Sequence, residues 1–193
     1  LDAIVWLAEE NKSAEVVKMV TSLSDFFRTT LSKGHDYITV KEERTHIESY
    51  LEIQQFRYQD ILDYEIRMNE EIYGYIIPKL TLQPLVENAL YHGIKNKRGK
   101  GKILITGEKQ GDKIIFQVID NGKGMTEKEL NNLRKKMAGT DTGNEEKGFG
   151  VSNVNQRIKY YYGDEYGVFF ESKENEGTNA TIIIAAKNIQ PPS

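Results

Sequence analysis

The spacing of apolar residues changes near residue 60, and this change limits the folds that the chain can adopt. Over residues 16–31 the apolar side chains recur every three or four positions, which predicts an amphipathic helix. Over residues 62–68 they alternate with polar side chains, which predicts a half-buried strand. We therefore expect a helical segment over roughly 1–60, followed by a region that contains a sheet.

Three helices are expected in the first sixty residues. Residues 1–7 have the pattern of a helix end, and a second helix is predicted to run from a cap at Ser13 to a stop at Gly34. Thr39 and Glu42 have the spacing of a capping box, so a third helix should begin there. The apolar stripes indicate core packing, and their narrowness also suits a helical dimer bundle.

The rest of the chain alternates between short extended pieces and helices. We expect strands at 62–68, 73–77, 102–107, 113–120, 168–172 and 178–186, and helices at 84–93, 126–137 and 150–162. Residues 138–147 hold two glycines and several charges without an apolar pattern, so we expect a loop there. These elements predict an α+β fold in which a mixed sheet carries helices on one face.

Composition excludes several classes of protein. The 193-residue chain has no cysteine, so it has no disulfides, thiolate metal sites or cysteine nucleophiles. Its 26 basic and 29 acidic residues give a net charge of −3, and we expect no nucleic-acid partner. No signal peptide is visible, and no run approaches the roughly 18 apolar residues of a membrane span. The chain starts inside an apolar helical pattern, so we expect it to be a piece of a longer protein.

Four clusters of polar residues and glycines lie at the ends of the predicted elements. The first is on the helix 85–93, where Asn88 and His92 are one turn apart and face the same way, as do Glu87 and Tyr91. A polar stripe that includes an asparagine on an otherwise buried helix suits a ligand. A solvent-facing stripe explains the same pattern equally well.

The second cluster, residues 120–125, follows an apolar strand. Asp120 at the strand end can accept a hydrogen bond from the amine of a base. Gly122 and Gly124 allow the backbone to close against a flat ligand, and Met125 follows them. Taken alone, this pattern is more often an ordinary turn.

The third cluster places Gly148, Phe149 and Gly150 at the start of a helix, where free N–H groups can bind a phosphate. It is not a Rossmann fingerprint, because Asn153 occupies the position of the third glycine. It is not a Walker A motif either, because no G-K-[ST] string exists in the chain.

The fourth cluster is Gly177-Thr178 at the start of the last strand, which alone indicates only a hairpin turn. In this order and on these elements, the four clusters resemble the N, G1 and G2 boxes and the terminal Gly-Thr of the GHKL ATPase fold. Histidine kinases, gyrase, Hsp90 and MutL share that fold. The strings over 42–58, 82–94 and 150–157 resemble more narrowly the LytS/YesM class of sensor histidine kinases.

This resemblance covers nearly the whole chain and implies a domain organisation. It implies a GHKL (Bergerat) ATP-binding α/β sandwich over 61–189, after a helical dimerisation-type segment over 1–60 and before a tail at 190–193. It also implies phosphoryl transfer from Mg·ATP to a histidine and then to an aspartate of a response regulator. The parent would be a homodimeric bacterial membrane sensor with this part in the cytoplasm.

The resemblance also assigns roles to single residues. Asn88 would hold Mg²⁺, and Glu87 beside it is a second candidate catalytic residue whose role stays open. Asp120 would bind the adenine amine, and Thr178 would support it through water. The other nucleotide contacts would come from His92, Gly122, Gly124, Met125, Gly148, Phe149 and Gly150. Residues 138–147 would form a lid over the phosphates.

The chain departs from the family pattern at three places. Tyr91 stands where many members have lysine, which puts one phosphate contact in doubt. Pro84 stands where some relatives of the fold carry a glutamate base, which argues against a plain ATPase. The phosphoacceptor histidine of this class lies in a string that would precede Leu1, so we expect no autophosphorylation by this chain alone.

The three histidines of the chain are the other candidate acceptors, and none is expected to serve. His35 is expected in a loop, His46 on a solvated helix face and His92 in the wall of the ATP site. Two other functions stay open. Steady ATP turnover would favour an ATP-gated clamp of the gyrase, Hsp90 or MutL type, and failure to bind adenine nucleotides would favour a nucleotide-free interaction module.

Overall fold

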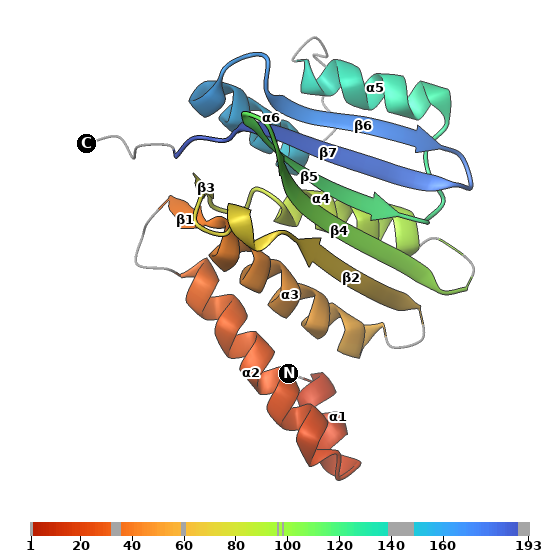
Figure 1. Ribbon diagram of the computed structural model, residues 1–193. Coiled ribbons are helices and arrows are strands. Elements are labelled where there is room, and N and C mark those ends of the chain that lie inside the picture. Colours follow the sequence, from red (N-terminus) through yellow and green to blue (C-terminus); the bar gives the residue numbers. More distant parts are fainter. Residues whose placement is uncertain are drawn as a thin grey trace.

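A five-stranded mixed sheet forms the centre of the protein, in a computed structural model that describes residues 2–31, 36–58, 61–95, 97, 99–138 and 149–188. Its strand order is β2-β4-β5-β7-β6, and β2 and β4 are parallel while the other neighbours are antiparallel (Figure 1). The strands are β2 (Leu62–Met68), β4 (Gly101–Gln110), β5 (Lys113–Asp120), β6 (Gly167–Lys173) and β7 (Gly177–Ala185).

Helices cover one face of this sheet. They are α4 (Gln83–Asn88), which continues as the π-helical segment η3 (Ala89–Ile94), α5 (Glu127–Met137) and α6 (Phe149–Tyr162). Side chains on β5 alternate in burial, so Ile114, Phe116 and Val118 share the core with Leu90 and Ile158 of these helices. This alternation places the residue two positions after Val118, which is Asp120, on the helix-covered face as well.

The remaining helices are α1 (Asp2–Glu9), α2 (Ser13–Thr30) and α3 (Val40–Arg57). In Figure 1, α1 and α2 project away from the sheet, and α3 lies between α2 and the sheet. Ile47 and Leu51 of α3 are fully buried and belong to the same core as the sheet. A short pairing of β1 (Tyr37–Thr39) with β3 (Ile76–Pro78) and a 3₁₀ helix, η2 (Glu70–Ile72), complete the described part of the fold.

The capping box predicted at the start of α3 is confirmed. Thr39 Oγ1 accepts a hydrogen bond from the backbone of Glu42 at 3.1 Å, and the Glu42 carboxylate accepts one from the backbone of Thr39 at 2.7 Å. The same arrangement starts α5, where Thr126 and Glu129 cap each other. Both caps satisfy N–H groups that a helix start otherwise leaves unpaired.

The predicted α+β fold with a mixed sheet is confirmed, and two local predictions are wrong. Ser13 is the first residue of α2 rather than its cap, and Lys12 before it makes no capping hydrogen bond through its side chain. The extended piece expected at 73–77 is a strand only at its end, since residues 73–74 form a turn and β3 starts at Ile76. The expected helix stop at Gly34 and all but the first residue of the loop expected at 138–147 lie outside the described residues.

In the ranges that the structure describes, no helix is both long enough and apolar enough to span a bilayer.

Candidate functional site

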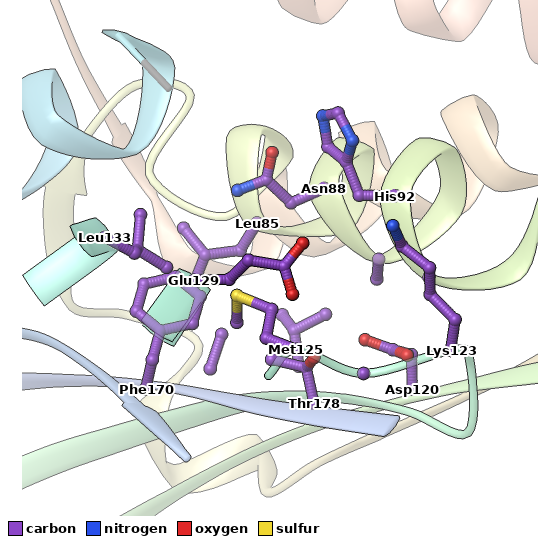
Figure 2. Close-up of a pocket in the computed structure, with 15 residues that line it drawn as sticks. Leu85, Asn88, His92, Asp120, Lys123, Met125, Glu129, Leu133, Phe170 and Thr178 are labelled. Carbon is purple, nitrogen blue, oxygen red and sulfur yellow. The ribbon is translucent and has the colours of Figure 1, made fainter. Parts of the chain in front are cut away.

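A cavity of about 230 Å³ lies between the helices and the β5, β6 and β7 side of the sheet. Figure 2 shows Asn88 and His92 on its helical wall, opposite Asp120, Met125 and Thr178. The lining residues are Leu85, Asn88, Ala89, His92, Gly93, Val118, Asp120, Lys123, Gly124, Met125, Glu129, Leu133, Phe170, Thr178 and Ala180. Most of these are apolar, so the cavity suits a flat apolar ring that carries polar groups at its edge.

Asp120 places a buried carboxylate on the floor of this cavity. It ends β5, is only 5% exposed, and accepts a hydrogen bond from the backbone N–H of Gly122 at 2.8 Å. Burial raises the pKa of Asp120 to about 6, while hydrogen bonds from the Gly122 and Thr178 backbones and the nearby Lys97 cation act in the opposite direction. A donor on a bound ligand would offset part of the cost of burying this carboxylate.

Three glycines allow the backbone to pack closely around Asp120. A Cβ on Gly93 would lie 2.6 Å from Asp120 Oδ1, and a Cβ on Gly122 would lie 2.4 Å from the carbonyl carbon of Gly93. Gly124 has φ +63°, and a Cβ there would lie 2.0 Å from the carbonyl oxygen of Lys173. Larger residues at these positions would displace the backbone that shapes the cavity.

Thr178 lies directly across the β5–β7 pair from Asp120. Its hydroxyl is 2.9 Å from Ser172 Oγ, which donates to the Gly177 carbonyl and accepts from the backbone N–H of Met125. Ser172 therefore fixes both Thr178 and the loop that carries Met125 at the edge of the cavity.

The start of α6 lies against the face of α4 that carries Asn88. A Cβ on Gly150 would lie 3.3 Å from Pro84 Cβ. Pro84 and Asn88 are one turn apart on α4, so they share a face. The start of α6 therefore lies on the side of α4 that carries Asn88.

The structure brings together six of the residues predicted for the site: Asn88, His92, Asp120, Gly124, Met125 and Thr178. Gly122 and Glu87 are not among the lining residues: Gly122 donates its backbone N–H to Asp120, and Glu87 accepts a hydrogen bond from Gln83 at 2.8 Å. Phe149 is the first residue of α6, and Gly148 lies outside the described residues.

Sequence reasoning missed the apolar part of the lining. Val118 and Ala180 lie two residues from Asp120 and Thr178 on the same strands, so the two-residue period of a strand could have found them. Leu133 and Phe170 carry no local signal, because only the packing of α5 against β6 brings them to the cavity.

The expectation that His46 lies on a solvated helix face is wrong. Its side chain is 1% exposed and is hydrogen-bonded through both ring nitrogens to Thr29 and Gln83. The packing of α2 against α3 covers it, and no local pattern on α3 indicates that packing.

No group of three or more His, Asp or Glu side chains that could hold a metal exists within the described ranges.

Two family models match the chain. One is described as the histidine kinase-, DNA gyrase B-, and HSP90-like ATPase and matches residues 78–188, and the other is described as histidine kinase and matches residues 1–62. The chain therefore belongs to the family of histidine kinase-, DNA gyrase B- and HSP90-like ATPases. The family models and the fold define it as an ATPase domain of the type found in histidine kinases, preceded by a segment of the histidine kinase family.

Sensor histidine kinases are among the similar curated proteins. The chain is 32% identical over 188 residues to sensor histidine kinase YesM of Bacillus subtilis. The aligned region covers 97% of this chain and 31% of YesM. It is 28% identical over 170 residues to sensor histidine kinase BtsS of Escherichia coli. That aligned region covers 88% of this chain and 28% of BtsS. The chain thus spans about three tenths of the length of these relatives.

Solved structures share the fold at lower identity. The catalytic domain of histidine kinase ThkA has a TM-score of 0.59 at 19% identity, and the match covers 80% of this chain and 97% of that domain. Histidine kinase AdeS of Acinetobacter baumannii has a TM-score of 0.55 at 16% identity, with coverage of 96% and 85%.

Proposed function

We propose that this chain binds Mg·ATP in the cavity and supplies the catalytic site for phosphoryl transfer to a histidine. The phosphoryl group would then pass to an aspartate of a response regulator. The observation that carries this proposal is the buried Asp120 carboxylate, held by a glycine-rich loop on the floor of an apolar cavity, across from Asn88. The relatives, which are named sensor histidine kinases, support the direction of transfer.

Asp120 suits recognition of adenine. A carboxylate accepts a hydrogen bond from the exocyclic amine of adenine, and its lone pairs would oppose the carbonyl oxygen of guanine at the same place. Apolar side chains such as Leu85, Met125 and Phe170 would contact the faces of the ring. The volume of about 230 Å³ suits the base, with the phosphates leading out past Asn88.

Asn88 suits a Mg²⁺ ligand because its amide oxygen is a hard donor on the wall nearest the start of α6. The N–H groups at that helix start, with Gly148 and Gly150, would bind the phosphates. When bound, Mg²⁺ neutralises charge on the transferring phosphate, and the remaining task of the protein is to align it.

The exposed face of α2 supports a homodimer. Val17, Val20, Phe27 and Leu31 are 65%, 47%, 50% and 72% exposed and fall on one helical stripe with the spacing of a coiled-coil seam. We infer that two copies pair through the helical segment over 1–60, which leaves the region 61–189 to bind nucleotide. The parent would be a membrane sensor with this part in the cytoplasm.

A calorimetric titration with ATP, with and without Mg²⁺, tests the proposal. The unmodified chain should bind ATP more tightly with Mg²⁺, and Asn88→Ala should remove the effect of the metal while weaker binding remains. An Asn88→Ala variant that keeps the full effect would show that Asn88 is not the ligand. Steady hydrolysis of ATP by the unmodified chain would favour an ATP-gated clamp instead.

A further inference from the structure

A line of side-chain hydrogen bonds crosses three helices and ends beside the nucleotide site. Thr29 Oγ1 on α2 lies 2.7 Å from His46 Nδ1 on α3, and His46 Nε2 lies 2.6 Å from Gln83 Oε1 on α4. Gln83 Nε2 then donates to Glu87 Oε1 at 2.8 Å. Glu87 directly precedes Asn88, so the line joins the helical segment to the helix that lines the cavity.

Chemistry gives this line a single direction. An amide oxygen only accepts, so His46 Nε2 must carry the proton that it shares with Gln83. A flipped Gln83 amide would turn its oxygen toward the Glu87 carboxylate, which also only accepts. The donors from His46 Nε2 onward therefore point toward Glu87.

The other nitrogen of His46 accepts. Burial lowers the pKa of His46 and Lys79 acts the same way, while the hydrogen bond to Gln83 and the charge of Glu87 oppose them. A pKa below its ordinary value favours the neutral ring near pH 7, so Nδ1 accepts from Thr29 Oγ1, which shares its single proton with the carbonyls of Asp25 and Phe26 at 2.9 and 3.0 Å. Loss of that one hydroxyl would leave Nδ1 buried without a donor.

Few residues of α2 are buried, although the helix makes several polar contacts with α3 and with Lys79. Met19 and Ser22 are its only buried residues among those described, and its packing is against α3 rather than the sheet (Figure 1). Phe26 of α2 stacks on the His46 ring, with the centroids 4.8 Å apart and the planes 19° apart. Phe26 therefore contacts the face of the His46 ring, and Thr29 contacts its edge. Because so little of α2 is buried, its local unfolding costs little free energy.

We propose that His46 and Gln83 are positioning residues that couple the docking of α2 on α3 to the placement of Glu87, and thereby to nucleotide binding on α4. The inference rests on the proposed function. A nucleotide that fixes α4 favours the docked state of α2, and by linkage the docked state favours nucleotide binding by the same factor. The helical segment and the ATP site would then respond to each other without sharing a ligand.

The chain offers a matched control for this link. Ser22 of α2 donates to the Glu52 carboxylate of α3, and this second contact between the two helices ends on α3. Thr29→Val and Ser22→Ala each remove one hydroxyl from the same face of α2. Only Thr29 is connected through His46 to α4.

Amide hydrogen exchange across α2, with and without a saturating non-hydrolysable Mg·ATP analogue, tests the link. In the unmodified chain and in Ser22→Ala the analogue should slow exchange at the α2 end near Thr29 by about fivefold or more. Thr29→Val and His46→Leu should lose most of this slowing although titration shows that they bind the analogue. His46→Gln, whose amide can still donate to Gln83, should keep part of it.

Equal slowing in Thr29→Val and Ser22→Ala would overturn the inference. So would unchanged exchange in α2 when the unmodified chain is saturated with the analogue, and that result would leave the proposed function standing. An unmodified chain that binds no analogue would instead remove the proposed function, and the inference with it. If His46→Leu does not fold, Thr29→Val carries the test alone, because it replaces a hydroxyl by a methyl group of similar size.

Discussion

Glu43 is a second buried carboxyl, and its setting contrasts with that of Asp120 on the cavity floor. It is fully buried and accepts hydrogen bonds from the backbones of Leu80 and Leu82 at 3.1 and 2.7 Å. Leu80 has φ +58°, and its carbonyl accepts from Arg157 of α6. Glu43 therefore fixes the turn that starts α4, whereas Asp120 faces the cavity and is available to a ligand.

The free energy of unfolding should depend on pH through the protonation of Glu43. Burial raises its pKa to about 7, against the opposing hydrogen bonds from Leu82 and Leu80 and the charge of Arg157. The folded state then binds more protons than the unfolded state between about pH 4.5 and 7, so the free energy of unfolding falls as pH rises through that window. The Glu43 contribution is on the order of 3 kcal/mol, from a pKa of about 7 in the folded state against the ordinary 4.5.

Urea denaturation from pH 4 to 8 measures this effect, with Glu43→Gln as the comparison. The variant lacks the titrating group, so its free energy of unfolding should fall less than that of the unmodified chain over the same range. Asp120 remains in both proteins, so the difference between them isolates Glu43. Parallel curves would show that Glu43 titrates as an ordinary exposed glutamate.

At the scale of an element, the loop after β5 depends on Gly124. Gly124 and Gly111 have nearly the same left-handed backbone, φ +63° and +62°, but a Cβ on Gly111 would have nothing within 4 Å. Gly111→Ala should therefore cost about 1 kcal/mol, from conformation alone. Gly124→Ala adds a collision with the Lys173 carbonyl, so it should cost clearly more and also weaken ATP binding. Equal losses in chemical denaturation would contradict this account of the loop.

The apolar stripe on α2 makes a second prediction at this scale. Phe27→Glu places a charge in the inferred dimer seam and should shift the chain toward monomers in sedimentation experiments. Phe169 on β6 is a matched control, because it is 49% exposed against 50% for Phe27. Phe169→Glu should leave the oligomeric state unchanged. A dimer that tolerates Phe27→Glu but not Phe169→Glu would place the interface on the sheet instead.

At the scale of the whole molecule, the sequence predicted what short-range rules determine. The capping box at Thr39 and Glu42, the hairpin between β4 and β5, and the strand that delivers Asp120 each depend on residues close together in the chain. The membership of the family, predicted from the order of the four clusters, is confirmed by the family models.

The features that were missed arise from contacts between distant elements. The sequence of α3 makes His46 look like a surface residue. It is buried because α2 and α4 pack against it, and it is hydrogen-bonded to both helices. Glu43 is an acidic residue in the first turn of α3, yet it is buried against the turn before α4. Neither the period of a helix nor its caps contain this information, because it depends on which faces of the helices meet.

The central claim is that this cavity binds ATP through Asp120, and a titration that compares ATP with GTP tests it most directly. With Mg²⁺ present, the unmodified chain should bind ATP and should bind GTP far more weakly. Asp120→Asn should lose about tenfold or more of the affinity for ATP, because one hydrogen bond to a charged acceptor contributes about 1.5–3 kcal/mol. Equal affinity for the two nucleotides, or unchanged ATP binding in Asp120→Asn, would contradict the account.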